Sequence, residues 1–477
     1  MRRLAIVAAA LACLTGAPGQ IWEKRVAPGV VYREEIERAV PRIVHSLRIS
    51  LKCSSLRAEP ELAGEAVFDD TVTKGRDTVT HMVQRTKAIA GINADFFHVP
   101  YTGDPLGLFL KAGRLDSVPT FPRAVLAWGE EGATFALPTW TGKVILPGGA
   151  GLPLDGINEL ATGDRVTLDT PATGFVLASG PNTALLLRSP SASWGAECDA
   201  DLEISEVVKD LTKRSLGPGE AALVASGSSE AALVRAAVGQ RIRIHWQTDG
   251  LDWRQYPNAV GGGPFLVRAG KLAIDWKEER FRDALALKRH PRSAVGLTPM
   301  GDLVLVAVDG RQAFSDGASL DELAAIVLRL GCVDAMNLDG GGSTCLSLGG
   351  LALNRPSDGT ERPVADAILV FTEGAKGSGS APQFALKGPP NIAIGGEGAF
   401  SLLRDGKAVP NAVIFWSAAG SAWVDQGGIL HPIAVGDANL TAWLDGNSVT
   451  IRVPVRPKPA PKPAAKPKRK PRHASGR

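Results

Sequence analysis

The segment at residues 339–344 reads Asp-Gly-Gly-Gly-Ser-Thr and combines residue types suited to catalysis on an anionic substrate. Three consecutive glycines let the backbone approach a ligand closely and let several N–H groups point at one anion. Asp339 adds a carboxylate at the entrance of this loop. The segment is not a nucleotide P-loop, because no Gly-Lys-Ser/Thr follows. We expect ligand-binding roles for Gly340, Gly341, Gly342, Ser343 and Thr344.

Two arginines, Arg292 and Arg362, are candidates for holding such an anion. Arginine binds phosphate through paired hydrogen bonds and keeps its charge. Arg292 opens an apolar segment, so we expect it at the mouth of a strand. Further pocket walls are expected from Asn-x-Asp segments and from the glycine-rich loop at residues 261–264. These candidate substrate-binding residues are Asn93, Asp95, His98, Gly262, Gly263 and Asn337.

One well-marked helix is predicted over residues 320–330. Ser319 and Glu322 form a capping box ahead of apolar residues at helical spacing. Gly331 suits the left-handed position that commonly follows a helix. This helix should therefore be followed directly by a new element.

Apolar segments at residues 303–308 and 333–338 predict buried strands on either side of this helix. If the two strands are parallel neighbours, Asp309 and Asp339 emerge at the same sheet edge. Ligand sites of strand–helix–strand units tend to lie at that edge. Asp339 is thus the first candidate catalytic carboxylate and Asp309 the second. A Ca²⁺ or Mg²⁺ ion held by this pair is an open alternative.

The two halves of the sequence share similar patterns. A predicted helix at residues 78–90, a glycine, a strand and Asn-x-Asp recur around residues 320–339. Predicted hairpins at residues 109–115 and 265–272 both turn at Ala-Gly. We interpret these echoes as an internal duplication. Because strands outnumber helices, we predict an α+β fold with a mixed sheet.

Composition divides the 477 residues into five parts. Residues 1–19 resemble a secretory signal peptide, with Cys13 as an alternative lipidation site. Residues 20–372 form the main domain, and a Gly/Ser linker follows at 373–380. Short alternating segments predict an Ig-like β-sandwich at 381–455. Residues 456–477 are rich in Pro, Lys and Arg and predict a disordered tail.

Hydrophobic residues make up 44% and charged residues 21% of the chain, which excludes disorder of the whole. The tail carries nine basic residues and no acid, so the net charge of +4 leaves the folded body acidic. A nucleic-acid-binding domain would carry its positive charge on the fold, so we expect no specific nucleic acid. No later segment is long and apolar enough for a transmembrane span. Disulfides and free thiols both remain open for Cys53, Cys198, Cys332 and Cys345.

The motifs together resemble the phosphodiester glycosidase family. The resemblance rests on residues 93–97, 105–107, 261–264, 291–296, 308–311, 337–343 and 354–357, in family order. It covers about residues 25–372 and implies hydrolysis between a sugar anomeric carbon and a phosphodiester. The substrate would be a sugar-phosphate glycan or glycoconjugate of the envelope or the extracellular space.

The residues suggest a mechanism of this class that requires no cofactor. Asp339 would act as nucleophile or as base toward water, with Asp309 second. The glycine amides, Arg292 and Arg362 would hold the phosphate. Asn93 and Asp95 would bind sugar hydroxyls. The leader implies export to the periplasm, cell surface or medium, where the tail could contact anionic envelope polymer.

Two other functions remain open. A non-catalytic binder of envelope polysaccharide would suit the C-terminal module and tail. A metal-dependent phosphodiesterase would attack phosphorus through a metal on Asp309 and Asp339. Turnover separates the enzymes from the binder, and sensitivity to a chelator separates the two enzymes.

Overall fold

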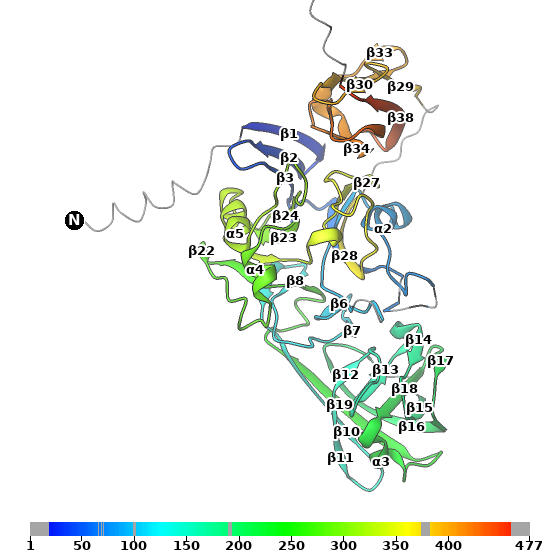
Figure 1. The fold of residues 1–477 in the computed structure, drawn as a ribbon. Helices are drawn as coiled ribbons and strands as arrows, with labels where there is room; N and C mark the ends of the chain where they lie inside the picture. Colours follow the sequence, from blue (N-terminus) through cyan, green and yellow to red (C-terminus); the bar gives the residue numbers. More distant parts are fainter. Residues whose placement is uncertain are drawn as a thin grey trace, which may run out of the picture.

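The computed structural model describes residues 19–64, 66–67, 69, 71–98, 102–188, 193–373 and 382–458. The predicted signal peptide before residue 19, Cys13, nearly all of the linker and most of the basic tail lie outside these ranges. Figure 1 shows three parts: a central body, a lobe at one end and a C-terminal module at the other.

The central body is built from three sheets. The first runs in the order β1 (Gln20–Ala27), β2 (Val30–Glu37), β3 (Arg42–Ile49), β24 (Leu303–Val308), β23 (Arg292–Leu297), β25 (Asp334–Asn337), β21 (Phe265–Arg268) and β22 (Lys271–Leu272). The second runs β27 (Leu351–Ala352), β26 (Leu346–Leu348), β5 (Ala90–Asn93), β28 (Asp366–Thr372) and β4 (Leu56–Leu62). The third runs β7 (Arg114–Ser117), β6 (Phe109–Lys111), β20 (Asn258–Gly261), β8 (Val125–Gly129) and β9 (Gly132–Ala136).

A shared apolar core joins these three sheets. Leu47 and Leu305 come from the first sheet, Ile92 and Ile368 from the second, and Leu126 from the third; all five are fully buried. Burial of such side chains is the main force that stabilises a fold. The sheets therefore pack face to face, which brings the ends of β5 and β25 together.

The lobe lies within the range that we predicted as one domain. Its main sheet runs β11 (Gly151–Leu154), β10 (Thr139–Ile145), β19 (Arg241–Asp249), β16 (Glu197–Lys209), β15 (Asn182–Arg188), β18 (Glu220–Ser226), β13 (Val166–Asp169) and β12 (Gly156–Ile157), and a small sheet pairs β14 (Phe175–Leu177) with β17 (Lys213–Ser215). β10 and β19 connect it to the body (Figure 1).

The C-terminal module is all-β. Its strands are β29 (Phe384–Lys387), β30 (Ile392–Ala393), β31 (Gly398–Ala399), β32 (Ser401–Arg404), β33 (Lys407–Ala408), β34 (Phe415–Gly420), β35 (Ala422–Val424), β36 (Ile429–Pro432), β37 (Gly436–Leu444) and β38 (Asn447–Arg456). They enclose their own core around Trp416 and Leu430. The β character agrees with the sequence, and the Ig-like topology stays a prediction.

Helices are few and short, so the protein is mostly β rather than the mixed α+β fold that we expected. In the described part of the chain they are α2 (Val79–Thr86), α3 (Glu230–Leu233), α4 (Asp283–Leu287) and α5 (Leu320–Arg329), with 3₁₀ turns η1 (Pro171–Thr173), η2 (Gly227–Ser229), η3 (Gly341–Ser343) and η4 (Asn411–Val413). Within the described ranges, none of the helices has the length and apolar character needed to cross a membrane.

The helix predicted at residues 320–330 is confirmed as α5. Ser319 and Glu322 form the complete capping box, and Gly331 has φ +90°. The strand after it is β25, but β23 lies between β24 and β25. Because β23 is antiparallel to both, β24 and β25 are parallel but are not neighbours. The predicted adjacency of Asp309 and Asp339 therefore fails.

The two predicted echoes are visible in the fold. α2 leads into β5 and α5 leads into β25, and each strand ends at the asparagine of an Asn-x-Asp segment. Both hairpins turn through positive φ at Ala-Gly, at Ala112 and at Ala269. The hairpin follows the Asn-x-Asp segment in the first half but precedes it in the second. The internal duplication stays a prediction.

Candidate functional site

Three carboxylates meet where β5, β25 and β28 come together. Asp95 and Asp339 each lie two residues beyond a strand, and Asp366 begins β28. The amide of Asp339 donates to the carbonyl of Ala94 at 2.9 Å, and the amide of Asp95 donates to Asp366 Oδ1 at 2.9 Å. The α2–β5 segment and the α5–β25 segment are therefore each followed by one aspartate of this carboxylate cluster.

Burial gives the three carboxylates different proton affinities. Asp95 and Asp366 are 1% and 0% exposed, whereas solvent reaches Asp339 in part. Burial raises the pKa of Asp95 to about 7 and that of Asp339 to about 6. Burial, reinforced by the charges of Asp95 and Asp339, raises the pKa of Asp366 well above its ordinary value. Asp339, whose pKa is lower than that of Asp95, therefore loses its proton at lower pH than Asp95 does.

Glycines let the backbone close around Asp95. The amides of Gly107 and Phe96 donate to its two oxygens at 2.6 and 2.7 Å. A Cβ at Gly107 would lie 2.5 Å from Asp95 Oδ2, and one at Gly261 would lie 2.4 Å from it. Any side chain at these two positions would therefore push Asp95 out of place.

The predicted glycines of the neighbouring loop also permit close packing. A Cβ at Gly262 would lie 2.9 Å from the carbonyl oxygen of Asn337. Gly263 has φ +104°, and a Cβ there would lie 2.5 Å from Glu279 Oε2. They shape the wall of the site through backbone contacts.

Arg123 is the residue of this site that the sequence analysis missed. Its guanidinium lies 4.2 Å from the ring centroid of Phe281 and 5.4 Å from that of Phe96. Its charge lowers the pKa of both Asp95 and Asp339. Within the described part of the chain, its buried Nη1 has no hydrogen-bond partner. A buried donor without a partner calls for an explanation, and a ligand is the natural one. No motif marks Phe-Pro-Arg at residues 121–123.

Two more arginines flank the glycine loop. A Cβ at Gly341 would lie 3.0 Å from Nη2 of Arg311, and one at Gly342 would lie 2.1 Å from Nη2 of Arg362. Arg362 also lowers the pKa of Asp339 and pairs with Asp358 at 2.5 Å. The structure thus brings Arg362 to the site as expected and adds Arg311.

Several buried polar atoms in and around the predicted loop lack hydrogen-bond partners among the described residues. Among the described residues these include Asn337 Oδ1, Ser343 Oγ, Thr344 Oγ1 and Asp366 Oδ2. The Ser343 hydroxyl is near enough to lower the pKa of Asp339 although the two make no hydrogen bond of ordinary geometry. Unpartnered acceptors and hydroxyls suit a ligand rich in hydroxyl groups.

The glycine amides are less available than expected. The amide of Gly340 donates to Asp339 Oδ1 at 2.8 Å, and that of Gly341 donates to the carbonyl of Pro291 at 2.9 Å. Two of the three predicted phosphate-binding amides are therefore engaged within the chain. The guanidinium groups are better placed to hold an anion.

Arg292 does not reach this site. Its Nε donates to the carbonyl of Ala318 at 2.8 Å, and its Nη2 donates to the carbonyls of Leu285 and Lys288. The side chain is 2% exposed, and burial lowers its pKa to about 10. It starts β23 as predicted, but its guanidinium ties backbone segments together rather than facing the carboxylates.

Asp309 lies in a separate polar cluster. Its Oδ2 is 3.3 Å from His45 Nε2, and its Oδ1 accepts the amide of Arg355 at 2.7 Å. This placement follows from β23, which separates β24 from β25. Asp309 and Asp339 thus follow the ends of parallel strands, as predicted, but these strands are separated by β23 and are not neighbours.

Asn93 and His98 also have other partners. Asn93 Nδ2 donates to the carbonyl of Asp339 at 2.7 Å, and its Oδ1 accepts Ser293 Oγ at 2.7 Å. It therefore holds the loop of Asp339 rather than a sugar. His98 Nδ1 lies 2.9 Å from Asp104 Oδ2. Hydrogen bonding to Asp104 raises the pKa of His98, which is half-exposed.

No metal site emerges from the described residues, in which no three His, Cys, Asp or Glu side chains are grouped to hold an ion. The four cysteines in the described ranges are free thiols. Burial raises the pKa of Cys332 to about 12, so that thiol stays protonated.

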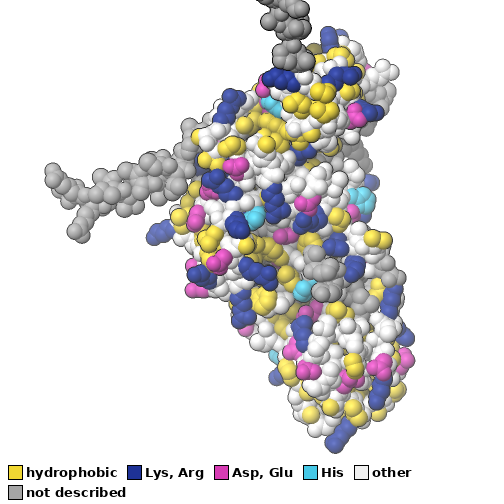
Figure 2. Space-filling model, viewed as in Figure 1, with side chains coloured by type: hydrophobic (Ala, Val, Ile, Leu, Met, Phe, Trp, Pro, Cys, Tyr) yellow, Lys and Arg dark blue, Asp and Glu magenta, His cyan; other side chains and the backbone are white. Residues whose placement is uncertain are grey.

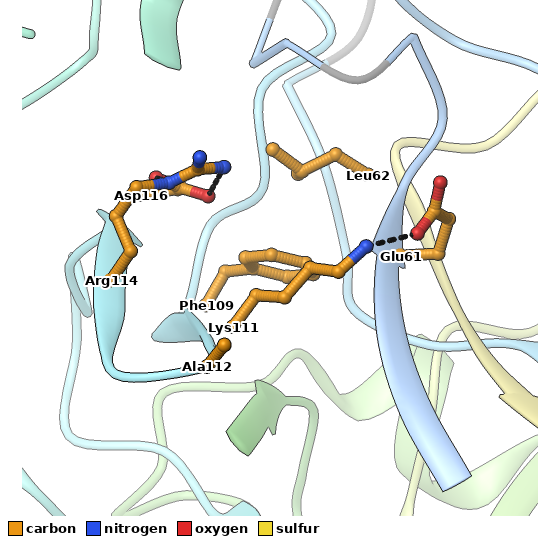
Figure 3. A pocket seen from close by; sticks show the side chains of 7 residues that line it. All are labelled: Glu61, Leu62, Phe109, Lys111, Ala112, Arg114 and Asp116. Carbon is orange, nitrogen blue, oxygen red and sulfur yellow. Dashed lines mark hydrogen bonds and ion pairs between the residues drawn. The ribbon is translucent and has the colours of Figure 1, made fainter. Parts of the chain in front are cut away.

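A polar groove of about 380 Å³ lies beside β4, β6 and β7 (Figure 3). It is lined by Leu62, which faces Asp366 across the β4–β28 pair, and by Phe109, two residues after Gly107. Lys111 pairs with Glu61, and the Arg114 guanidinium makes two hydrogen bonds to Asp116 at 2.7 and 2.8 Å. Its cations are thus neutralised within the groove. The candidates for holding an anion near Asp339 remain Arg123 and Arg311, together with Arg362, which Asp358 also pairs with.

Residues 208–371 match the family model described as phosphodiester glycosidase. The match contains Gly261, Asp339 and Asp366 but not Asp95 or Arg123. Two curated proteins are similar to part of the chain. The SPbeta prophage-derived uncharacterized protein YomE of Bacillus subtilis is 40% identical over 82 residues, which are 17% of this chain and 13% of that protein. The N-acetylglucosamine-1-phosphodiester alpha-N-acetylglucosaminidase of Bos taurus is 46% identical over 108 residues, or 21% of this chain and 20% of that protein.

A solved structure resembles a larger part of the fold. The crystal structure of a hypothetical protein from Synechocystis has a TM-score of 0.64 and 23% identity, and the match covers 75% of this chain and 64% of that chain. It supports the fold alone. The chain spans a fifth or less of the length of the two curated relatives. From the family model and the bovine relative, the part of the chain that contains residues 208–371 is similar to the phosphodiester glycosidase family.

Proposed function

We propose that this chain is a hydrolase that cleaves the bond between a sugar anomeric carbon and a phosphodiester. One observation carries the proposal. Carboxylates that differ in pKa lie beside arginines at the glycine loop, and this loop is within the part of the chain that is similar to phosphodiester glycosidases. A carboxylate pair performs hydrolysis at an anomeric carbon, and guanidinium groups hold a phosphate.

Three arginines would stabilise the departing phosphate. The second pKa of a phosphate monoester is about 6, so this leaving group needs little help from a proton donor. Charge stabilisation should matter more, and it is strongest from groups that are already in place. Arg123, Arg311 and Arg362 supply that charge around the glycine loop.

Two carboxylates would share the chemistry at carbon. Asp339, with a pKa of about 6, is mainly charged at pH 7 and would act as nucleophile or as base toward water. Asp95, with a pKa of about 7, would donate or accept the accompanying proton. Asp366 would stay protonated and hold the amide of Asp95 through its Oδ1. Asp309, expected second, has no place in this scheme.

The geometry favours this function over a metal phosphodiesterase. That alternative requires Asp309 and Asp339 to share one ion, whereas Asp309 is bound to His45 and to the amide of Arg355. The non-catalytic binder would use the same polar pocket without turnover. Only the enzyme requires carboxylates whose protonation states differ.

An Asp339→Asn variant tests the proposal. Asparagine keeps the size and one acceptor oxygen but cannot act as nucleophile or base. We expect a loss of roughly 10²–10⁴-fold in the hydrolysis of sugar-1-phosphodiesters, with an unchanged melting temperature. Asp309→Asn serves as the matched control and should keep kcat, because its carboxylate contacts His45 and the amide of Arg355 rather than the proposed reacting bond. Near-normal turnover by Asp339→Asn would remove Asp339 from the mechanism.

We further propose that the enzyme acts outside the cytoplasm on an envelope or extracellular glycan. The leader-like N-terminus supports export, and the basic tail suits contact with anionic polymer. On the face drawn in Figure 2, basic and acidic side chains are interspersed rather than gathered in a basic stripe. That distribution supports a glycan rather than a nucleic acid as the partner.

A further inference from the structure

The C-terminal module is fastened to the body by buried charges. Lys24, 3% exposed, donates to the carbonyl of Gln426 at 2.6 Å. Glu34 Oε2 accepts the amide of Gln426 at 2.8 Å. Breaking such buried, hydrogen-bonded groups is costly. The module is therefore held in one position on the body.

Arg355 connects this module to the loop at residues 309–316. Its Nη1 and Nη2 donate to the carbonyls of Ala422 and Gly420 at 2.7 and 2.6 Å. Its Nε donates to Gln312 Oε1 at 2.8 Å, and its amide donates to Asp309 Oδ1 at 2.7 Å. One arginine thus binds two strands of the module and two positions of the loop.

An aromatic stack makes a second connection. Phe314 of the loop stacks on Trp423 of the module, with ring centroids 5.1 Å apart and planes at 22°. His431 stacks on Trp423 with centroids 4.0 Å apart. Trp423 is therefore fixed within the module before it meets Phe314. Such pairs add to the energy of burial.

Arg311 lies between Asp309 and Gln312, the two loop positions that Arg355 binds, and its guanidinium reaches the candidate site. It has φ +58°, and its guanidinium lies over Gly341. The side chain is exposed, and its hydrogen-bond partner among the described residues is His290 Nδ1 at 3.3 Å. Local contacts are thus weak, so the loop must fix where Arg311 points.

We propose that the C-terminal module positions Arg311 over the glycine loop, with Arg355 and Trp423 as the positioning residues. The inference rests on the proposed function insofar as Arg311 holds the phosphate of the substrate. It gives the module a role in substrate affinity, in addition to any role in attachment to a surface.

Variants of the full chain test this arrangement. Arg355→Met removes the hydrogen bonds of the guanidinium, and Trp423→Ala removes the stack. Ser417→Ala is the matched control, because its hydroxyl donates across the same interface to the carbonyl of Ala352 at 2.6 Å without touching the loop. We expect amide hydrogen exchange at residues 310–316 to accelerate about tenfold or more in the first two variants and to stay unchanged in the control.

Substrate affinity supplies the second measurement. Arg311→Ala should raise KM for a sugar-1-phosphodiester about tenfold, the scale of a lost charged hydrogen bond. Arg355→Met should raise KM similarly, and the double variant should show no further rise. Unchanged exchange at residues 310–316 would overturn the positioning role whatever the activity. Faster exchange with unchanged KM, or additive effects, would overturn it equally. If the wild-type chain hydrolyses none of these substrates, the proposed function fails. The affinity of each variant for inorganic phosphate is then compared in place of its KM.

Discussion

At the residue scale, the site depends on carboxylates that differ in protonation. Burial raises the pKa of all three. The Ser343 hydroxyl, the amide of Gly340 and the charges of Arg362 and Arg123 lower the pKa of Asp339 again, to about 6. Carboxylates of one type thus acquire different roles from their surroundings.

The pH profile should show this separation. Asp339 acts when it is charged, and Asp95 assists when it is protonated, with pKa values of about 6 and about 7. We expect kcat/KM to rise as pH increases toward 6 and to fall above 7 in a narrow bell. Over the same pH range, Asp339→Glu should displace the acidic limb of the profile. Asp95→Glu should displace its alkaline limb. A profile that is flat between pH 5 and 8 would contradict the assignment.

Asp366→Asn should keep activity and stabilise the protein at alkaline pH. The folded-state pKa of Asp366 is raised, so its stabilising contribution is full below the unfolded value of about 4 and is lost as pH rises through the folded value. Asparagine mimics the protonated form and still accepts the amide of Asp95. We expect the melting temperature to increase by several degrees at pH 8 and by less at pH 5. Asp366→Ala should lose activity, and a drop in stability of Asp366→Asn at pH 8 would contradict the account.

At the element scale, glycine loops decide how closely the strands approach. Gly107 precedes β6 and Gly261 ends β20, and both backbones contact Asp95 Oδ2. These are neighbouring strands of the third sheet. The site therefore depends on a backbone approach that no larger residue permits.

Alanine at Gly107 or Gly261 should disrupt this approach. The new Cβ would lie 2.5 or 2.4 Å from Asp95 Oδ2. We expect a loss of about 1–3 kcal/mol in unfolding free energy and at least a tenfold fall in kcat. Gly151→Ala in β11 is the control, because no atom lies within 4 Å of its Cβ position. Chemical denaturation and turnover measure both effects, and equal behaviour of the three variants would refute the packing argument.

The elements with strong local signals were predictable from sequence. α5 was predicted because its capping box, its apolar face and Gly331 all lie within a dozen residues. α2 ends earlier than predicted, because Lys87 adopts φ +61° after only two turns. The order of strands in a sheet has no such local signal. The insertion of β23 between β24 and β25 could not be predicted from the chain order.

The same limit explains which site residues were missed. Asp339 opens the glycine loop, Asp95 lies in an Asn-x-Asp segment, and Arg362 was predicted as an arginine able to bind phosphate. Asp366 begins an ordinary buried strand, and Arg123 lies in a loop without a motif. Their contacts to Asp95 come from distant parts of the chain. Sequence alone also could not show where the guanidinium of Arg292 points.

At the scale of the whole molecule, the protein consists of a body, a lobe and a C-terminal module. The body carries the candidate site, the lobe extends from it on β10 and β19, and the module packs at the other end beside the loop of Arg311 (Figure 1). Residues 208–371, which match the family, include the last part of the lobe and half of the site. Segments of the body that are far apart in sequence must therefore pack together before Asp95 and Asp339 can meet.

The position of bond cleavage tests the central claim most directly. The full chain would hydrolyse a panel of sugar-1-phosphodiesters in ¹⁸O-labelled water, with Asp339→Asn as the blank, and mass spectrometry would locate the label. Attack at the anomeric carbon predicts ¹⁸O in the released sugar and none in the phosphate. Label in the phosphate would mean attack at phosphorus and would contradict the proposed glycosidase.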